Sequence, residues 1–590
     1  MLYFLVFAPF LAALLMVAAS GKDSRSASRL AVILSSIFFL SGLSLLVSGN
    51  YNTTPFYWFS IPGTDVSVTL AFSVNGFSAW MVFLANIITL AALISARKTA
   101  GNNYRNYAIG LFTLLGALNG TFLSIDAVLF FFFFEALVLP AAILIGFYGG
   151  AERRAAALNF ALYTLIGSAP MAVALWYLIT LAGTSHIIPL AQAAQNLPES
   201  TQTILFWCFA IAFWVKTPLF PLHGWQAQTY AEAPAGLSAI LTGSMSKAGV
   251  YGFYFWVLAI FPAVSFKNAT LMVSLGLVTA LYGAFMAMRA KDMKKLLAFS
   301  SMSHLGLAIA GVFTLSEDVF PALLVLLVGH GLSASALFIL SGSAERFTGH
   351  RMLDKMGGLA SRNPAFAFFF GIASVLAIAI PGSAGFVGEF LVLLGLWGVC
   401  KFAAILAGLC VILTGVYMLK LIQKVLFGVP GEVSEDLQKL RFPISDAVAT
   451  APLLLLLIVF GVHPQPITST MDYTSDLAEE RAENIDAAVA AAENSDSIEQ
   501  QKIVELAQAS AEAQASMENF NAEDSLQMKE FFAKAALSLH PEWMADSATA
   551  NEKAKAYADS AWTALQTIKS QFSAESAEVN TEKVEAQNDR

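Results

Sequence analysis

The stretch AIAFWVKTPLFPLHGWQAQTYAEAPAGLSAILTGSMSKAGVYG, residues 210–252, decides how the rest of the chain is interpreted. It places two lysines, Lys216 and Lys247, inside runs that otherwise have the composition of membrane-spanning segments. Lys216 precedes Pro218 and Pro221, and proline breaks a helix because it has no backbone N–H to donate. A charge near the centre of a bilayer costs about 2.5–3.5 kcal/mol on insertion scales, so it is retained where it faces protein or water and has a function. A broken helix beside a buried charge is typical of the ion path of a transporter.

The composition predicts a polytopic membrane protein. Of the 590 residues, 57% are hydrophobic and only 13% are charged, and apolar runs of about 20 residues, the length that crosses the hydrocarbon core, recur along the chain. The three cysteines, Cys208, Cys400 and Cys410, have neither metal-ligand nor disulfide spacing. The sequence contains no Gly-rich phosphate loop, cysteine cluster or haem-attachment motif. We therefore expect no metal ion, cofactor or redox centre in this chain.

Charge divides the chain into two unlike parts. From Met471 onward there are 24 acidic and 9 basic residues, a net charge of -15, whereas the preceding part has 17 acidic and 24 basic residues, a net charge of +7. We expect a membrane domain over residues 1–465 and an acidic C-terminal extension over residues 466–590. The extension is rich in Ala, Glu, Gln and Ser and has weak helical periodicity, so we interpret it as helical or partly disordered.

Fourteen apolar segments are expected to cross the membrane as α-helices, which makes the predicted fold class all-α. Alternate loops, beginning with 21–29, carry 20 of the 24 basic residues that precede Met471, and only Lys267 and Lys401 fall in the other loops. By the positive-inside rule the basic loops are cytoplasmic, so both termini are expected in the periplasm of a Gram-negative cell. The segments lie at about 3–20, 30–48, 78–96, 107–123, 126–148, 158–182, 203–222, 234–260, 269–288, 296–314, 318–342, 364–398, 403–422 and 444–462.

Two of these segments, the seventh and the twelfth, are expected to be discontinuous helices. The seventh contains two prolines, and the twelfth contains Pro381-Gly382 followed by two further glycines. They are five spans apart, at corresponding positions of two possible repeats, spans 4–8 and 9–13. Matched broken helices in two halves are the best sequence pointer to an ion site at the membrane midplane. The repeat is inferred from the layout of the spans and not from residue identity.

Six titratable residues within the apolar segments form the candidate site. Histidine titrates near pH 6.5, and burial brings carboxyl and amino groups closer to that range, so a series of such groups can take up and release protons. Each residue also has a structural interpretation as a hydrogen-bonded packing residue, and this alternative is strongest for the two histidines. The candidates for proton translocation, in chain order, are Glu135, Lys216, Lys247, His304, His330 and Glu389.

Several segments that carry these residues resemble a known family. The segments are FFFFFEALVLP, WVKTPLFPLHGWQAQTYAEAP, SKAGVYG, KDMKKLLAFSSMSHLGL, GHGLSASALFILSG and PGSAGFVGEF. They resemble the antiporter-like membrane subunits of NADH:quinone oxidoreductase, respiratory complex I, and most closely the M type, which is homologous to mitochondrial subunit 4. The resemblance covers nearly all of residues 1–465. It implies fourteen helices with two inverted five-helix repeats and broken seventh and twelfth helices.

The resemblance also implies a role for the candidate residues. In the family, the glutamate that matches Glu135 pairs with the lysine that matches Lys216, and the lysine that matches Lys247 lies centrally. The two histidines continue a hydrophilic axis, and the glutamate that matches Glu389 ends it. The L type would carry a lysine at the Glu389 position and a long lateral helix after its last span. The acidic, broken extension of this chain therefore argues against the L type.

By this resemblance we expect a proton-translocating, multi-pass subunit of the bacterial inner membrane, driven by redox chemistry in other chains. Its expected partners are the N-type and L-type antiporter-like neighbours and the lipid bilayer, with NADH, FMN, iron–sulfur clusters and quinone in partner subunits and no nucleic acid. The sequence leaves open a multisubunit cation/proton antiporter, an inorganic-carbon uptake complex and, more weakly, a hydrogenase complex, because the axis residues are shared. For the extension we expect a periplasmic contact with a neighbouring subunit.

Overall fold

The computed structural model divides the chain into two compact units, Met1–Thr474 and Ser475–Arg590. The first unit is built almost entirely of α-helices. The expected helices of the acidic extension lie almost wholly outside the described residues. The described residues are 1–18, 24–48, 51–61, 66–97, 103–316, 319–428, 437, 439–471, 555–556 and 559.

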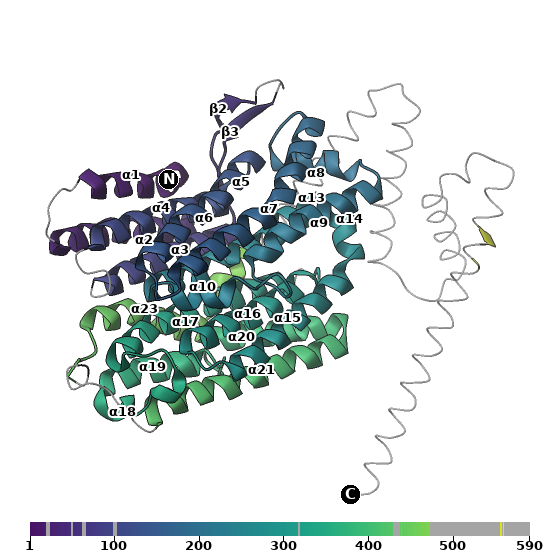
Figure 1. The fold of residues 1–590 in the computed structure, drawn as a ribbon. Helices are drawn as coiled ribbons and strands as arrows, with labels where there is room; N and C mark the ends of the chain where they lie inside the picture. The colour runs from purple at the N-terminus through teal and green to yellow at the C-terminus, as the bar shows by residue number, and fades with distance from the viewer. Residues whose placement is uncertain are drawn as a thin grey trace, which may run out of the picture. The chain divides into compact units, whose positions relative to one another are not determined.

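Long apolar helices form the bundle of the first unit (Figure 1). Each of the fourteen apolar segments predicted from the sequence overlaps a helix, and ten helices in the described part of the chain are long and apolar enough to cross a membrane. The chain is therefore a multi-pass membrane protein. The ten are α2 (Ser24–Ser48), α3 (Gly76–Ala96), α4 (Tyr104–Leu123), α5 with α6 (Ala127–Ala136 and Val138–Tyr148), α7 (Arg153–Ala182), α15 (Ala269–Arg289), α16 (Met293–Val312), α17 (Val319–Thr348), α21 with η5 (Lys401–Ile422 and Gln423–Phe427) and α23 (Ile444–Val462).

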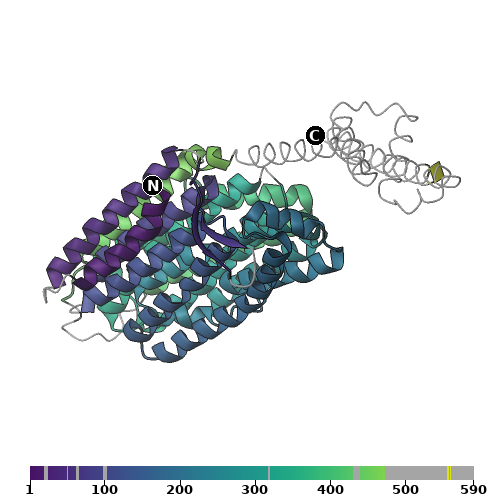
Figure 2. The same cartoon turned by 90° about the horizontal axis from the view of Figure 1, so that it is seen from above.

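Shorter helices complete the bundle. α1 (Leu2–Ala18), α19 (Pro364–Leu376) and α20 (Ala384–Val399) are also apolar, and α9 (Glu199–Lys216) carries the first lysine at its last residue. Both views show α1 and α2 side by side at one edge of the bundle (Figures 1 and 2). Connecting helices are α8 (Ile187–Gln195), α10 (Gln226–Glu232), α14 (Pro262–Lys267) and α18 (Leu359–Arg362).

The centre of the bundle is formed by α17, because the apolar stretch of this helix is buried along its whole length. α15 and α16 pack closely because glycines face each other across their contact. A Cβ added to Gly276 or Gly283 would come within 2.8 Å of a backbone nitrogen of α16. Small residues at such contacts let helices approach closely where hydrocarbon on both sides gives no hydrophobic driving force. The core is therefore fixed by shape and by polar contacts.

Both helix interruptions lie at the prolines from which the sequence predicted them. α9 ends at Lys216, and turns over residues 217–225 precede the start of α10. α19 ends at Leu376, and turns that include Pro381 precede α20. Gly382, in this second interruption, has a φ of +91°, a conformation that glycine adopts without a steric penalty.

Two isolated antiparallel bridges, Asp126 with His186 and Asp292 with Met352, are built in the same way. They lie 166 residues apart, both from 126 to 292 and from 186 to 352. In each bridge the aspartate side chain accepts hydrogen bonds from the first backbone amides of the following helix, α5 or α16. The backbone bond from the next residue also matches: the amide of Ala127 donates to the Ser185 carbonyl at 2.8 Å, as the corresponding amide in α16 does at 2.9 Å.

Two short strand pairs in the connection between α2 and α3 were not foreseen. β2 (Phe56–Ser60) pairs with β3 (Ser67–Leu70), and β1 (Tyr51–Asn52) pairs with β4 (Ser73–Val74), both antiparallel. The all-α expectation is wrong for this connection, where β2 and β3 project from the end of the bundle (Figure 1). β2 reads FYWFS, and aromatic residues favour strands, whereas its length is too short for a span.

The residues that follow the last long helix pack onto the bundle. α24 (Gln465–Thr468) buries Ile467 completely, and Trp80 on α3 donates its indole N–H to Thr470 Oγ1 at 3.1 Å. The carbonyl of Thr470 approaches Gly76 so closely that any larger side chain there would overlap it. These contacts join residues 465–471 to the bundle.

Removing residues 465–590 should destabilise the bundle more than removing residues 475–590. Loss of the buried Ile467 and of the Trp80 hydrogen bond should cost about 2–4 kcal/mol. Thermal unfolding of the full chain and of both truncated forms in the same detergent measures the difference. Equal transition temperatures for the two truncated forms would contradict this prediction.

Candidate functional site

Lys247 lies in a helix whose backbone is π-helical on both sides of it. The order along the chain is α11 (Ala235–Ile240), η2 (Leu241–Met245), α12 (Lys247–Tyr251), η3 (Gly252–Val257) and α13 (Leu258–Ile260). In the first π segment the amide of Ser246 donates to the carbonyl of Leu241, five residues back, at 3.0 Å. The Thr242 carbonyl then accepts two side-chain donors, Lys247 Nζ at 2.6 Å and Ser246 Oγ at 2.9 Å. Single π turns inside α-helices occur frequently at functional sites.

Lys247 is in direct contact with His330. The lysine is completely buried, and its Nζ lies 2.8 Å from Nδ1 of His330, which is carried by the central helix α17. One proton occupies this contact: either the lysine nitrogen donates it to an unprotonated Nδ1, or a protonated Nδ1 donates it to a neutral amine. The other ring nitrogen, Nε2, is buried and has no hydrogen-bond partner among the described residues.

His304 connects His330 to Glu389. The two imidazole rings stack with centroids 5.0 Å apart and an interplanar angle of 18°. Nδ1 of His304 lies 2.8 Å from the Ser300 carbonyl, which can only accept, so Nδ1 carries a hydrogen. Nε2 lies 3.0 Å from Oε1 of Glu389 on α20, and these two atoms share one proton. Oε2 of Glu389 is buried, and no described residue hydrogen-bonds to it.

Glu135 and Lys216 form a second cluster. Nζ of Lys216 donates to the Phe134 carbonyl at 3.2 Å and lies 4.5 Å from the centroid of the Phe134 ring. The Glu135 carboxylate is near enough to attract this lysine electrostatically, but it does not hydrogen-bond to it. Both carboxylate oxygens are buried, and neither has a hydrogen-bond partner in the part of the chain that the structure describes. Glu135 and Lys216, which were expected to pair, therefore lie close together without a hydrogen bond between them.

The two clusters meet where α12 packs against the end of α9. A Cβ added to Gly249 would overlap Thr217 Oγ1 and would lie 2.7 Å from the Phe213 carbonyl. Thr217 directly follows Lys216, and Gly249 is two residues after Lys247, so the backbone segments that carry the lysines touch. No hydrogen bond joins the two lysines within the described residues.

Three hydroxyl groups beside His304 were not singled out in the sequence. Ser300 Oγ lies 3.0 Å from Tyr417 OH, which donates to Thr414 Oγ1 at 3.0 Å. All three are buried, and the latter two lie on α21. Hydroxyl residues are common in apolar spans, so only their spacing could have drawn attention to them: Thr414 and Tyr417 are three apart and share a helix face.

Asp292 caps the start of α16 and also joins an ionic cluster. Its side chain accepts from the amides of Lys294 and Lys295, and it lies 3.4 Å from Nε of Arg351. Nη2 of Arg351 donates to Oε1 of Glu232 at 2.8 Å. Partial burial acts to lower the pKa of Arg351, but the hydrogen bond to Glu232 and the nearby carboxylates outweigh it and raise that pKa above its ordinary value. The cluster fixes the end of α10 against the start of α16.

The site lies within a segment that matches a known family. Residues 124–415, which include all six candidates, match the model of the family described as NADH:quinone oxidoreductase/Mrp antiporter, TM. Over 446 residues the chain is 34% identical to NADH-quinone oxidoreductase subunit M of Rickettsia felis, an alignment that covers 74% of this chain and 89% of that protein. The chain belongs to the NADH-quinone oxidoreductase subunit M family. The family expected from the sequence is confirmed.

Solved structures agree with this assignment. A chain of respiratory complex I from Thermus thermophilus with bound NADH superposes with a TM-score of 0.72 at 30% identity, covering 81% of this chain and 99% of that one. A chain of the Mrp complex from Dietzia sp. DQ12-45-1b has a TM-score of 0.71 at 21% identity, covering 80% of this chain and 96% of that one. The second likeness shows the fold alone. The chain therefore has the antiporter-like fold of complex I membrane subunits.

Gly249→Ala should separate the two lysine-bearing segments. The added methyl group overlaps Thr217 and the α9 backbone, and overpacking of this kind costs about 1–3 kcal/mol. Gly408→Ala is the matched control, because a Cβ there meets no atom within 4 Å. Thermal unfolding of both variants in detergent should show a lowered transition only for Gly249→Ala. A transition unchanged from wild type in both variants would mean that α12 and α9 do not depend on this contact.

Proposed function

We propose that this chain is a proton-translocating membrane subunit of an NADH:quinone oxidoreductase in a bacterial inner membrane. The observation that carries the proposal is the line of titratable groups that contact one another in turn, from Lys247 through His330 and His304 to Glu389. Membership of the subunit M family supports the assignment. NADH, FMN, iron–sulfur clusters and quinone would be held by partner subunits, so this chain would supply a proton path and no redox chemistry.

The line can move protons because each hydrogen-bonded contact holds one proton that either partner can own. Protonation of Glu389 leaves His304 neutral, and its ionisation leaves His304 cationic, since Nδ1 keeps its hydrogen in both cases. Lys247 and His330 exchange their shared proton in the same manner. The stacked rings of the two histidines make no direct hydrogen bond, and both ring nitrogens of His304 already have partners. A bridging water would therefore join Nε2 of His330 to Oε2 of Glu389, which both lack hydrogen-bond partners among the described residues.

Glu135 and Lys216 would act as the charge-sensitive entrance to this line. Lys216 ends α9, and a cation is stabilised at the C-terminal end of a helix by the exposed carbonyl groups there. An ionised Glu135 attracts the ammonium, and a protonated one does not. A proton on Glu135 would therefore weaken the hold on Lys216 and favour its movement toward Lys247, across the contact of α9 with α12.

We further propose that spans 4–8 and 9–13 of fourteen crossings are inverted repeats. The support is the matching pair of bridges at Asp126 and Asp292, which recurs with an offset of 166 residues. α7 and α17 have the same offset, from Arg153 to Val319 and from Ala182 to Thr348. Five spans separate equivalent elements, so an odd number of crossings inverts them. Figure 1 shows α8 and α18, which follow the two bridges, at opposite ends of the bundle.

Glu135→Gln and Lys216→Ala should each reduce NADH-driven proton pumping by about 10²-fold, the usual effect of removing a proton-transfer group. The measurement is dye quenching in inverted membrane vesicles, with the amount of assembled complex determined on native gels. The controls are Glu199→Gln and Lys267→Ala, which break an exposed ion pair between α9 and α14. Control variants should pump within twofold of wild type. An unchanged number of protons per NADH in both Glu135→Gln and Lys216→Ala would remove this mechanism.

Purification of the tagged chain in mild detergent should recover NADH- and quinone-binding subunits together with other antiporter-like membrane subunits. Mass spectrometry of the recovered proteins measures this directly. Recovery of antiporter subunits alone would instead assign the chain to a multisubunit cation/proton antiporter, whose fold it shares. Recovery with a zinc protein and no NADH-binding subunit would assign it to an inorganic-carbon uptake complex.

A further inference from the structure

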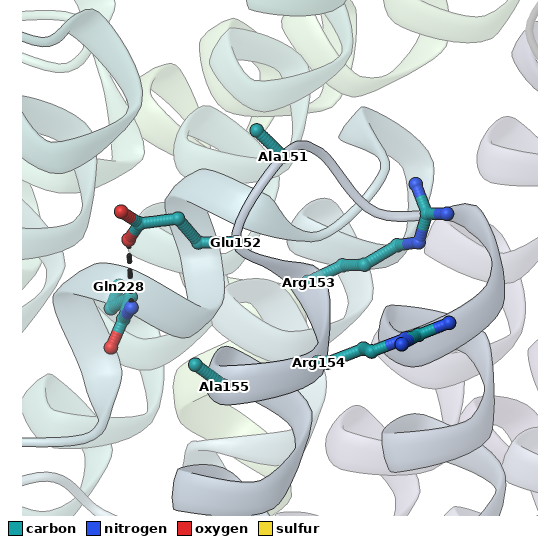
Figure 3. Close-up of a pocket in the computed structure, with 6 residues that line it drawn as sticks. All are labelled: Ala151, Glu152, Arg153, Arg154, Ala155 and Gln228. Atoms are coloured by element: carbon teal, nitrogen blue, oxygen red, sulfur yellow. Dashed lines mark hydrogen bonds between the residues drawn. The ribbon is translucent and has the colours of Figure 1, made fainter.

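An open cavity of about 640 Å³ lies at the N-terminal end of α7, and none of the six candidate residues lines it. Residues 151–155 and Gln228 form its wall (Figure 3). This end of α7 belongs to one of the loops that the distribution of basic residues predicts to be cytoplasmic. The cavity therefore lies at the level where an α-helix emerges from the bilayer, where lipid headgroups are found.

The cavity has an acidic side and a basic side (Figure 3). Gln228 donates its side-chain amide to Oε2 of Glu152 at 3.0 Å, and Asn159 donates to the Gln228 carbonyl oxygen at 3.3 Å. The backbone amide of Glu152 is held by Glu232 at 2.9 Å. The Glu152 carboxylate is thus fixed in place, and this network uses only one of its oxygens, which leaves Oε1 available to a donor.

The basic side consists of Arg153 and Arg154, both exposed. Within the described residues, Arg154 makes no hydrogen bond or ion pair, and the Arg153 guanidinium contacts only the Gly149 carbonyl, at 3.4 Å. The backbone amides of Arg154 and Ala155, in the first turn of the helix, also lack acceptors in this part of the chain. Two free guanidinium groups and first-turn amides are the donors that a phosphate group prefers.

An exposed apolar stripe begins directly below these arginines. Leu158, Leu162 and Ile166 follow Arg154 at intervals of four residues and are 58%, 46% and 69% exposed. Residues four apart lie on one face of a helix, so the basic side of the cavity continues into an apolar track along α7. The track is suited to an acyl chain that descends from a headgroup held in the cavity.

We propose that the cavity binds the headgroup of phosphatidylethanolamine, with the phosphate against Arg153 and Arg154, the primary ammonium against Glu152, and the acyl chains along the exposed face of α7. Charge complementarity selects this lipid. An anionic lipid without an amine would place its charge beside Glu152 and leave that carboxylate unpaired. Phosphatidylcholine has the same net charge, but its quaternary ammonium has no N–H to donate to Glu152.

Native mass spectrometry of the purified full-length chain tests the proposal, with dioleoyl phosphatidylethanolamine, phosphatidylcholine and phosphatidylglycerol added separately. The ethanolamine lipid should bind about tenfold more tightly than the choline lipid, because only it makes a charge-assisted hydrogen bond to the carboxylate. Glu152→Gln should remove this preference and leave the affinity for the choline lipid unchanged. Arg154→Gln should weaken binding of both lipids.

Arg289→Gln is the control, because Arg289 is an exposed arginine at the end of another span on the same predicted side. The lipid preference of this variant should equal that of wild type.

Equal affinity of the wild-type chain for the ethanolamine and choline lipids would overturn the proposal, as would tighter binding of phosphatidylglycerol. Glycerophosphoethanolamine, which has no acyl chains, should bind far more weakly than the intact lipid. Equal binding would make the cavity a site for a soluble phosphate ester. Loss of all lipid binding in the assembled complex, with a neighbouring subunit cross-linked to Arg154→Cys, would make it a protein interface.

Discussion

The contact between Lys247 and His330 is the interaction on which the interior of this protein depends. A completely buried amino group must have its donors satisfied, because an unpaired charge in a medium without water is very costly. The imidazole supplies one partner and the Thr242 carbonyl supplies the other. The first partner requires α17 to run through the middle of the bundle. The second requires that the Thr242 carbonyl accept a side chain, whereas in an uninterrupted α-helix this carbonyl would accept from the backbone amide four residues later.

The rest of the polar interior is arranged around that contact. Stacking on His330 positions His304. Glu389 reaches His304 because α20 begins inside the bundle, after the interruption that separates it from α19. The ionic cluster around Arg351 holds the end of α10, the helix that follows the other interruption, against the start of α16. Lys247, His330, His304 and Glu389 thus lie along one line, and outward-facing surfaces carry apolar side chains such as those of α7.

Much of this site could be predicted from the sequence, because a charged residue in an apolar run is conspicuous whatever its neighbours are. Lys216 beside two prolines and Glu389 after Pro381-Gly382 indicated both the candidates and the broken helices. Apart from the pairing of Glu135 with Lys216, which the family resemblance implied, the contacts between these residues could not be predicted, because they depend on how helices far apart in the chain rotate against one another. Glu135 lies beside Lys216 without a hydrogen bond, and Tyr417 approaches Ser300, which no local pattern indicates. The pairing of Asp126 with His186 and of Asp292 with Met352 could not be predicted, because only the aspartate caps depend on residue type and the pairing itself lies in backbone hydrogen bonds.

The π-helical segments on both sides of Lys247 determine the direction in which this side chain points. An α-helix turns by about 100° for each residue, and a π turn accommodates one residue more than an α turn does. α12 is therefore rotated about its axis relative to the helical segments before and after it, and a regular helix through the same end points would carry Lys247 at another azimuth. The number of residues in this helix thus determines the direction in which the lysine points. A deletion of one residue in η2 would turn the ammonium away from His330, even though every side chain of the line remained present.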